Sequence, residues 1–504
     1  MRYLFKMGTA LFMSQFLASQ TLNDINYLTS SDLSGSARYT GMAGAFGALG
    51  GDLTAICDNP AASSVFLNTE IGASINFQSR INKGSYFGSL QTSEDENSHF
   101  DQFGAVFVFN NKDSENPWSR ISAGLNINRV ATFDQNAGLN GINSSGIADY
   151  FLYYADGVPF GDIQLYDDKN IEDVYRYLGD EVGYGFQQAF LGYQAYIIDP
   201  YSFDVTERAY FSNVDSSQVR HDLDLSNRGF HRKTSFNFST LYQNLLHVGV
   251  NINSHKIEFI NDQELFEGDH DLDSYVYDIN FNNYLISIGE GFSMQFGAIL
   301  KLKNLRLGAS YDSPQWIDIQ DETKQNLSAY RFEDGSEIQE IIDPAEITNS
   351  FAPYRLKIPS KINLSLAYIF NESGLISFDY SSQDLSNSSL SQSGGSNFLD
   401  NLTSEVSTNF NAVNTIKVGG EYRIKNLSLR GGYFYRTKNQ SLVSNDDQAF
   451  TFGIGLNFYG SNLNLSFVQF DQNKRFQLFS EGLTDSYELS KSLSQITLSY
   501  NFKL

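Results

Sequence analysis

The residues of this chain that could do chemistry are few and poorly spaced. Asp269, Asp271 and Asp273 have the opening spacing of a calcium loop. Ser274, however, stands where such a loop needs glycine, and Asn280 stands where it needs a bidentate glutamate. We therefore interpret this stretch as a solvated acidic loop.

The nucleophile and metal-ligand motifs of enzymes are also missing from the sequence. His231, His247 and His255 come nearest to a metal cluster, but the last two share one expected strand at a spacing that holds them apart. No Gly-x-Ser-x-Gly motif occurs. The single Cys57 excludes a disulfide framework and a zinc site built on several thiolates. We expect no catalytic residue, no metal and no cofactor, and hence a protein that is not an enzyme.

The composition and the charge of the chain narrow the class of protein. The chain has 504 residues, 34 Lys and Arg against 58 acids, and a net charge of -24. This balance argues against a nucleic-acid partner, because phosphate backbones are held by clustered cations. Aromatic residues make up 14% of the chain and only 8 residues are proline, which favours strands over helices. We expect acidic stretches such as 94–96 to lie in solvated loops.

The N-terminus has the features of an export signal. A basic start, Arg2 and Lys6, precedes an apolar run from Met7 to Ala18, so we expect residues 1–20 to be a signal peptide cleaved after Gln20. The apolar run is too short to cross a bilayer as a helix, and no later stretch approaches the roughly 20 apolar residues needed.

The strongest signal is a series of segments in which every second residue is apolar, as when one face of a strand meets lipid or core. Ile362, Leu364, Leu366, Tyr368 and Phe370 form the clearest example. The segments, counted back from Leu504, are 71–90, 103–109, 121–131, 234–242, 248–259, 292–302, 305–311, 362–370, 376–380, 416–424, 427–435, 452–458, 463–467 and 496–504.

The connections between these segments alternate in length. Turns rich in Gly, Asn and Lys occur at 303–304, 371–374, 425–426 and 459–462. Long polar connections occur at about 312–355, 381–412, 436–449 and 471–490. Short turns at one end and long loops at the other are typical of outer-membrane barrels. The sequence thus predicts an all-β, transmembrane antiparallel barrel of about fourteen strands over residues 69–504, closed so that no strand edge is exposed in lipid.

Two regions depart from the strand pattern. Residues 132–231 form a long insertion on the loop side, in which 171–178 and 186–191 have helical spacing, and Phe186, Phe190 and Leu191 could line a hydrophobic mouth or pack on one another. Before the barrel, a glycine-dense stretch suits close packing in a confined space, and we expect residues 21–68 to plug the lumen. Its residues of interest are Gly41, Gly44, Gly47, Gly50, Gly51, Asn59, Pro60 and Ala61.

The run ending in Asp58-Asn59-Pro60-Ala61-Ala62 resembles the N-terminal hatch of the FadL/TodX family of outer-membrane transporters of fatty acids and aromatic hydrocarbons, in its Bacteroidetes-type branch. Residues 307–314, 358–360, 418–423 and 429–433 are also similar to that family. The resemblance implies a fourteen-stranded barrel in the Gram-negative outer membrane, capture of a small hydrophobic ligand by extracellular loops, gating by the hatch (residues 21–68), and lateral or periplasmic release.

No loop residue can be matched individually to the family, so the ligand stays open between a long-chain fatty acid, an aromatic hydrocarbon and a haem-like compound. A second hypothesis is a barrel that binds or assembles a partner protein and transports nothing. We expect contacts with outer-membrane lipid and lipopolysaccharide, and a monomer.

Overall fold

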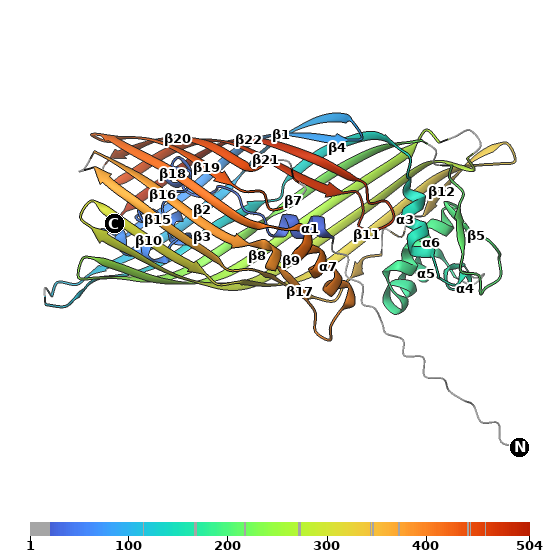
Figure 1. The fold of residues 1–504 in the computed structure, drawn as a ribbon, viewed down its shortest axis with the longest axis horizontal. Coiled ribbons are helices and arrows are strands. Elements are labelled where there is room, and N and C mark those ends of the chain that lie inside the picture. The colour runs from blue at the N-terminus through green and yellow to red at the C-terminus, as the bar shows by residue number, and fades with distance from the viewer. Residues whose placement is uncertain are drawn as a thin grey trace, which may run out of the picture.

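The computed structural model describes residues 21–504 except 114, 166–168, 216–217, 271–273, 343, 345–346, 371–372, 441–442, 444 and 459. The chain forms one long barrel whose strands run obliquely to its axis, with short turns at the end that carries the C-terminus and a helical cap at the other (Figure 1). The expected signal peptide, residues 1–20, lies outside the described residues.

The barrel is closed by its first and last strands. β1 (Glu70–Tyr86) pairs with β22 (Ser486–Lys503) from Glu70↔Lys503 to Ser85↔Glu488, and with β2 on its other side. Fourteen antiparallel strands complete the wall, which confirms the predicted fold class. The remaining wall strands are β2 (Ser89–Asn110), β3 (Trp118–Thr132), β7 (Val219–Tyr242), β8 (Leu246–Gly268), β9 (Val276–Leu302), β10 (Leu305–Asp312), β15 (Lys361–Phe370), β16 (Gly374–Asp384), β18 (Ala412–Ile424), β19 (Leu427–Arg436), β20 (Asp447–Phe458) and β21 (Ser461–Gln477).

Several shorter strands prolong the wall at the helical end. β4 (Gln135–Asn143) follows β3 along β7, and β11 (Gln315–Glu333) follows β10 along β9. β14 (Tyr354–Ile358) pairs with β11 and with β17 (Ser389–Ser391). β12 (Ser336–Ile342) and β13 (Asn349–Ser350) also pair with β11, whereas β5 (Ile198–Pro200) and β6 (Tyr210–Ser212) form a separate small sheet.

The outer and inner faces of the wall differ in polarity. On β8, Ile252 is 54% exposed, while its neighbours Asn251 and Asn253 point inward and are buried. The same alternation exposes apolar side chains on every side of the short-turn half, which fits a surface that dissolves in lipid. Outward examples are Phe77, Phe236, Phe296, Leu364, Ile376, Tyr422, Phe452, Leu465 and Leu498.

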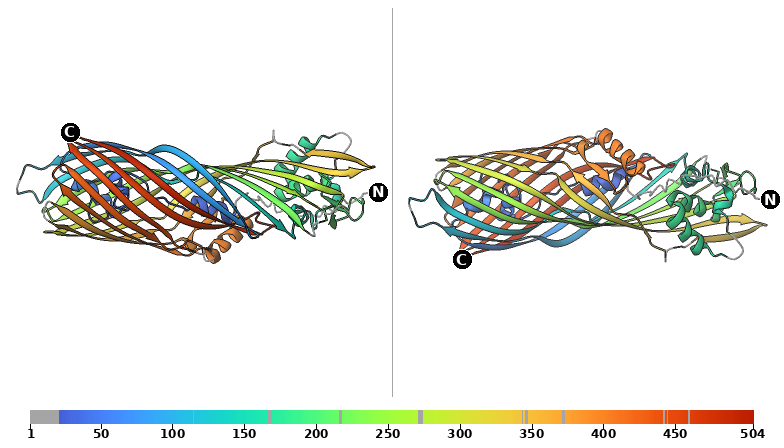
Figure 2. Two further views of the ribbon diagram at one scale, coloured as in Figure 1. Left: turned by 90° about the horizontal axis from the view of Figure 1, so that it is seen from above. Right: turned by 90° about the horizontal axis from the view of Figure 1, so that it is seen from below.

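Short helices occupy the bore and the cap. In the bore lie α1 (Leu22–Leu28), α2 (Ala37–Thr40), η1 (Thr54–Cys57) and η2 (Pro60–Val65), drawn in dark blue in Figure 2. The cap contains α3 (Ile147–Ala155), α4 (Phe160–Ile163), α5 (Ile171–Tyr177), η3 (Leu178–Val182) and α6 (Tyr184–Gln194), while η4 (Leu385–Asn387) and α7 (Asn397–Asn409) lie beside the wall. The predicted helical spacing at 171–178 and 186–191 is confirmed by α5 and α6.

Some predicted boundaries are wrong. The first strand does not run through 71–90, because Phe87 and Gly88, both with positive φ, turn the chain into β2. Residues 94–96 are therefore in a strand and not in a loop. Polar residues mislead here because this part of the wall extends beyond the apolar band.

The long connections are also more structured than predicted. The 132–231 insertion begins with β4 and ends where β7 starts at Val219. Region 312–355 is mostly the β11–β14 extension, and region 471–490 shrinks to residues 478–485 between β21 and β22. Among the described residues, no helix is long and apolar enough to cross a membrane.

Candidate functional site: the hatch and the spaces above and below it

The hatch is seated on glycines of the barrel wall. A Cβ atom on Gly249 would lie 2.5 Å from the carbonyl carbon of Pro60, and one on Gly308 would lie 2.5 Å from the carbonyl oxygen of Gly47. Real Cβ atoms do not approach so closely, so only glycine fits. Gly297, Gly419 and Gly432 meet the hatch in the same way, and a Cβ atom on Gly453 would lie 3.2 Å from Gly41 Cα. The wall therefore contains a set of side-chain-free positions that accept the hatch backbone.

Asn59 and Pro60 form the centre of this contact. The Asn59 side chain caps η2 by accepting a hydrogen bond from Ala61 N, at 3.1 Å. Its Nδ2 atom donates to the carbonyl oxygen of Gly47 at 2.7 Å and to that of Ala298 on β9 at 3.2 Å. One side chain thus holds two parts of the hatch together and ties them to the wall.

The predicted hatch glycines have different roles. Gly44, Gly50 and Gly51 have positive φ values of 72°, 61° and 64°, which glycine adopts without strain. Gly41 has ordinary φ but packs on the wall, where its Cβ would lie 3.1 Å from Gly453 Cα. Gly47 N donates to Asp379 Oδ2 on β16 at 2.8 Å.

A buried carboxylate ties the hatch to the wall at the short-turn end. Glu421 on β18 accepts from Arg38 of the hatch at 3.0 Å and from Arg430 of β19 at 2.7 Å, and pairs with Arg423 at 2.6 Å. The Glu421 side chain is 1% exposed and that of Arg430 is 4% exposed, so both charges are shielded from water. Such charges depend on one another, because removing one leaves the other uncompensated.

Three spaces follow one another along the bore, separated by α1 and by the body of the hatch. The upper space, of about 200 Å³, lies between the cap and α1 and is largely aromatic. Its aromatic lining residues are Tyr27, Tyr150, Tyr153, Tyr154, Tyr184, Tyr284, Phe398, Phe476, Phe479 and Tyr487. Tyr27 of α1 forms its floor, stacked between Phe259 at 5.3 Å and Phe476 at 5.1 Å.

Sequence reasoning named other residues for this mouth. Phe190 and Leu191 are fully buried in the core of the cap, and Phe186 packs against that core. The described lining of the upper space includes their neighbour Tyr184 but none of these three. The aromatic run at 150–154 is the sequence signal that could have predicted this lining.

Replacing Phe398 of α7 tests whether the upper space binds apolar compounds. Because one aromatic contact contributes about 0.5–1.5 kcal/mol beyond its area, we expect Phe398→Ala to bind an apolar naphthylamine dye several-fold more weakly. Phe203→Ala is the matched control, since Phe203 is 72% exposed in the cap and does not line the space. Equal affinities of the two variants, measured by fluorescence titration, would show that the dye does not bind in the upper space.

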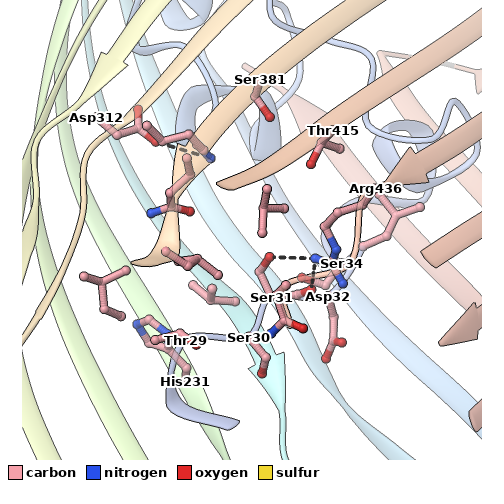
Figure 3. A pocket seen from close by; sticks show the side chains of 18 of the residues that line it. Thr29, Ser30, Ser31, Asp32, Ser34, His231, Asp312, Ser381, Thr415 and Arg436 are labelled. Carbon is pink, nitrogen blue, oxygen red and sulfur yellow. Dashed lines mark hydrogen bonds and ion pairs between the residues drawn. The ribbon is translucent and has the colours of Figure 1, made fainter. Parts of the chain in front are cut away.

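The middle space, also about 200 Å³, lies between α1 and the rest of the hatch and is polar (Figure 3). Lys361 pairs with Asp312 at 3.3 Å, and Arg436 donates to the Ser31 carbonyl oxygen at 2.7 Å. Hydroxyls of Ser381 and Thr415 line the same space. An apolar molecule would displace water from these groups without replacing its hydrogen bonds, which is unfavourable.

Two carboxylates of the N-terminal segment remain charged in this space. Burial alone would raise the pKa of Asp58, but the ammonium of Lys417, 3.3 Å away, together with Lys361 and the Tyr39 hydroxyl, holds it below its usual value. Burial likewise opposes ionisation of Asp32, yet nearby Lys491 and a hydrogen bond from Thr132 N lower its pKa. The middle space is therefore an ionic region.

The wall has a seam between β2 and β3. Backbone pairing of these strands covers Gln102↔Asn128 to Asn110↔Arg120, and β2 residues before Gln102 pair with β1. The seam is the part of the wall beyond Gln102↔Asn128, where backbone pairing on this side of β2 stops. A side-chain contact bridges it there: the Asp95 carboxylate of β2 accepts a hydrogen bond from Asn136 N of β4 at 3.0 Å. Residues 133–134 separate β3 from β4 and lie opposite Gly229 of β7, which has a φ of 120° and accepts a hydrogen bond from Phe133 N at 3.0 Å.

The histidines form no metal cluster in the described part of the chain. His231 on β7 and His255 on β8 lie 2.9 Å apart, Nε2 to Nδ1. His247 is separate and contacts Ser64 of the hatch at 2.8 Å. No group of three or more His, Cys, Asp or Glu residues among those described could hold a metal ion, and Asp271 and Asp273 lie outside them.

A closed barrel with lipid-compatible outer positions and a chain segment folded in its bore has the architecture of an outer-membrane β-barrel. No family model and no curated protein matches the sequence. Several solved structures do match over nearly the whole chain.

The toluene transporter TodX of P. putida is 15% identical, with a TM-score of 0.52, over 94% of this chain and 99% of that one. A FadL homologue of Pseudomonas aeruginosa is 10% identical, with a TM-score of 0.58 and the same coverage. The CymD monoaromatic hydrocarbon channel is 11% identical, with a TM-score of 0.50, again over 94% and 99%. The resemblance to FadL and TodX is thereby confirmed at the level of the fold.

Proposed function

We propose that this protein is an outer-membrane channel for passive uptake of a small hydrophobic compound, of the fatty-acid or aromatic-hydrocarbon class. The observation that carries the proposal is the fitted hatch, whose backbone rests on wall glycines inside a closed barrel. A barrel that only anchored a partner would not need a bore closed by a separate, glycine-fitted segment. The transport roles in the names of TodX and CymD support the same class.

In this proposal the aromatic upper space captures the ligand, and α1 separates it from the bore. Tyr27 contacts both the ligand space and the wall, so movement of α1 would open the way down. Below α1 the bore is ionic, and an apolar ligand gains more by entering lipid than by crossing charged side chains. This difference favours the β2–β3 seam as the exit over the short-turn mouth.

Uptake measurements with hatch variants test the proposal. In cells that lack their own uptake protein for the probe, we expect the wild type to accelerate uptake of radiolabelled oleate or toluene. Asn59→Ala should change that rate about fivefold or more, since it removes two hydrogen bonds that hold the hatch, each contributing about 1 kcal/mol. Asn304→Ala, in the exposed turn between β9 and β10, should leave the rate unchanged.

Heat-modifiable electrophoretic mobility serves as the check that each barrel is folded. If folded wild-type protein accelerates neither probe nor haem, the channel proposal fails. A partner protein that then co-purifies in stoichiometric amount would favour the binding or assembly barrel instead.

A further inference from the structure

The lower of the three spaces is a vestibule at the short-turn mouth, the end that faces the periplasm in outer-membrane barrels. It has a volume of about 840 Å³ and lies between the hatch and the strand ends. Its cationic lining residues are Arg38, Arg306, Arg423, Lys425, Arg430 and Lys503. The acidic ones are Asp52 and Glu70. This excess of cations stands out in a chain of net charge -24.

Strand alternation places two of these cations, Arg306 and Arg430, on the inner face. Arg306 on β10 points inward, next to Leu307, which is 40% exposed on the lipid side. Arg430 on β19 likewise alternates with the exposed Leu429. Bore-facing wall arginines and Arg38 of the hatch therefore form the inner part of the vestibule, while Lys425 lies at its rim, in the turn between β18 and β19.

The carboxylates nearby do not satisfy these cations. Glu421 is shared by three guanidinium groups, each with five N–H donors, whereas one carboxylate accepts about four hydrogen bonds. Asp52 accepts from Ser36 Oγ at 2.7 Å and Glu70 from Asn501 Nδ2 at 2.7 Å. The acidic groups are thus already engaged in local bonds.

Arg306 is the one cation of this set that has a buried, unpartnered donor atom among the described residues. Its Nη1 atom donates to the Leu49 carbonyl oxygen of the hatch at 2.5 Å, but its Nε atom is buried with no hydrogen-bond partner. Among the described residues it has no ion-pair partner. A buried guanidinium donor without an acceptor is unfavourable, and an anion in the vestibule would supply that acceptor.

We propose that the vestibule binds a small anion with more than one negative charge, carrying a phosphate group or several carboxylates. Planar guanidinium groups recognise both kinds of group by paired hydrogen bonds. The volume falls in the range of small-molecule sites. The bound anion would contact hatch and wall together, through Arg38 and Arg306. The proposal holds whether or not an apolar ligand is transported.

Calorimetric titration of the full mature chain in non-ionic detergent tests the site with inorganic phosphate, citrate and acetate. We expect saturable binding of phosphate or citrate with one ion per chain. Acetate should bind with an affinity at least roughly tenfold lower, since it offers fewer charge-assisted hydrogen bonds. Arg306→Gln should weaken binding roughly tenfold or more. Lys303→Asn is the matched control, because Lys303 is an exposed cation of the same mouth that does not line the vestibule.

A second arm identifies the source of the phosphate. In nanodiscs of phosphatidylglycerol, loss of phosphate binding relative to zwitterionic discs would assign the site to a lipid head group, and equal binding would assign it to a soluble anion. The proposal is overturned if neither phosphate nor citrate binds saturably. It is also overturned if Lys303→Asn weakens binding as much as Arg306→Gln, because attraction would then be diffuse.

Discussion

Gly297→Val should drive the hatch from its seat while leaving the barrel intact. The new Cβ atom would overlap Asn59 Oδ1 and lie 2.8 Å from Pro60 Cδ, so the hatch and the side chain cannot both keep their places. Overpacking of this kind costs about 1–3 kcal/mol, and strand β9 itself gains, because valine favours strands. The strain therefore falls on the hatch.

Cys57 provides the measurement, since it is the single thiol of the chain and is 4% exposed inside the hatch. We expect maleimide labelling of folded Gly297→Val to be roughly tenfold faster than in the wild type, the factor that corresponds to 1.4 kcal/mol. Gly431→Val is the matched control: its Cβ would meet only Thr451 O, at 3.8 Å. Slow labelling in both variants would mean that the hatch does not depend on the glycine seat.

Glu421→Gln should loosen the hatch where it meets the wall near the short-turn end. Neutralising a buried carboxylate that serves three arginines removes the ion-pair partner of Arg38 and Arg430, and breaking a buried pair in this way costs about 3–5 kcal/mol. We expect faster labelling of Cys57 and an earlier thermal transition. Arg423→Gln removes a partner that is 48% exposed and should cost about 1 kcal/mol or less.

A double variant separates loss of the ion pair from general damage. Arg38→Gln combined with Glu421→Gln removes both charges of the hatch contact, so it should recover part of the stability lost in Glu421→Gln. If the free-energy change of the double variant equals the sum of those of the two single variants, Arg38 and Glu421 are not energetically coupled, and this ion pair does not hold the hatch.

The barrel could be predicted from sequence because lipid imposes a simple pattern. Outward positions such as Ile362 and Leu364 must be apolar wherever the wall meets hydrocarbon, and the period of two is then unmistakable. Where the same strands leave the membrane, the outward face becomes polar, as at Asp318, Gln320 and Glu322 of β11. Strands such as β2 at 94–96 and β11 then look like loops, and their boundaries were missed.

The candidate site was predictable only where chain neighbours carry it. The Gly-rich stretch and Asn59-Pro60 indicate a segment packed in a confined space. The wall glycines on which this segment packs come from six different strands, and no local sequence pattern connects them. The upper space was not predicted for the same reason, since its lining residues Tyr27, Tyr154 and Phe398 come from three helices that are far apart in the sequence. The vestibule was also missed, because its cations are scattered singly from Arg38 to Lys503.

The length of the longest strands decides where molecules first meet this protein. β9 has 27 residues. At about 3.4 Å per residue that is roughly 90 Å of chain, or roughly 70 Å of height at a tilt of about 40°, against an apolar band of about 25 Å. The helical crown therefore stands roughly 40 Å above the hydrocarbon boundary. If the protein acts as the proposed channel, an oily solute would meet the cap among the inner sugars of a polysaccharide coat, without first diffusing to the lipid beneath.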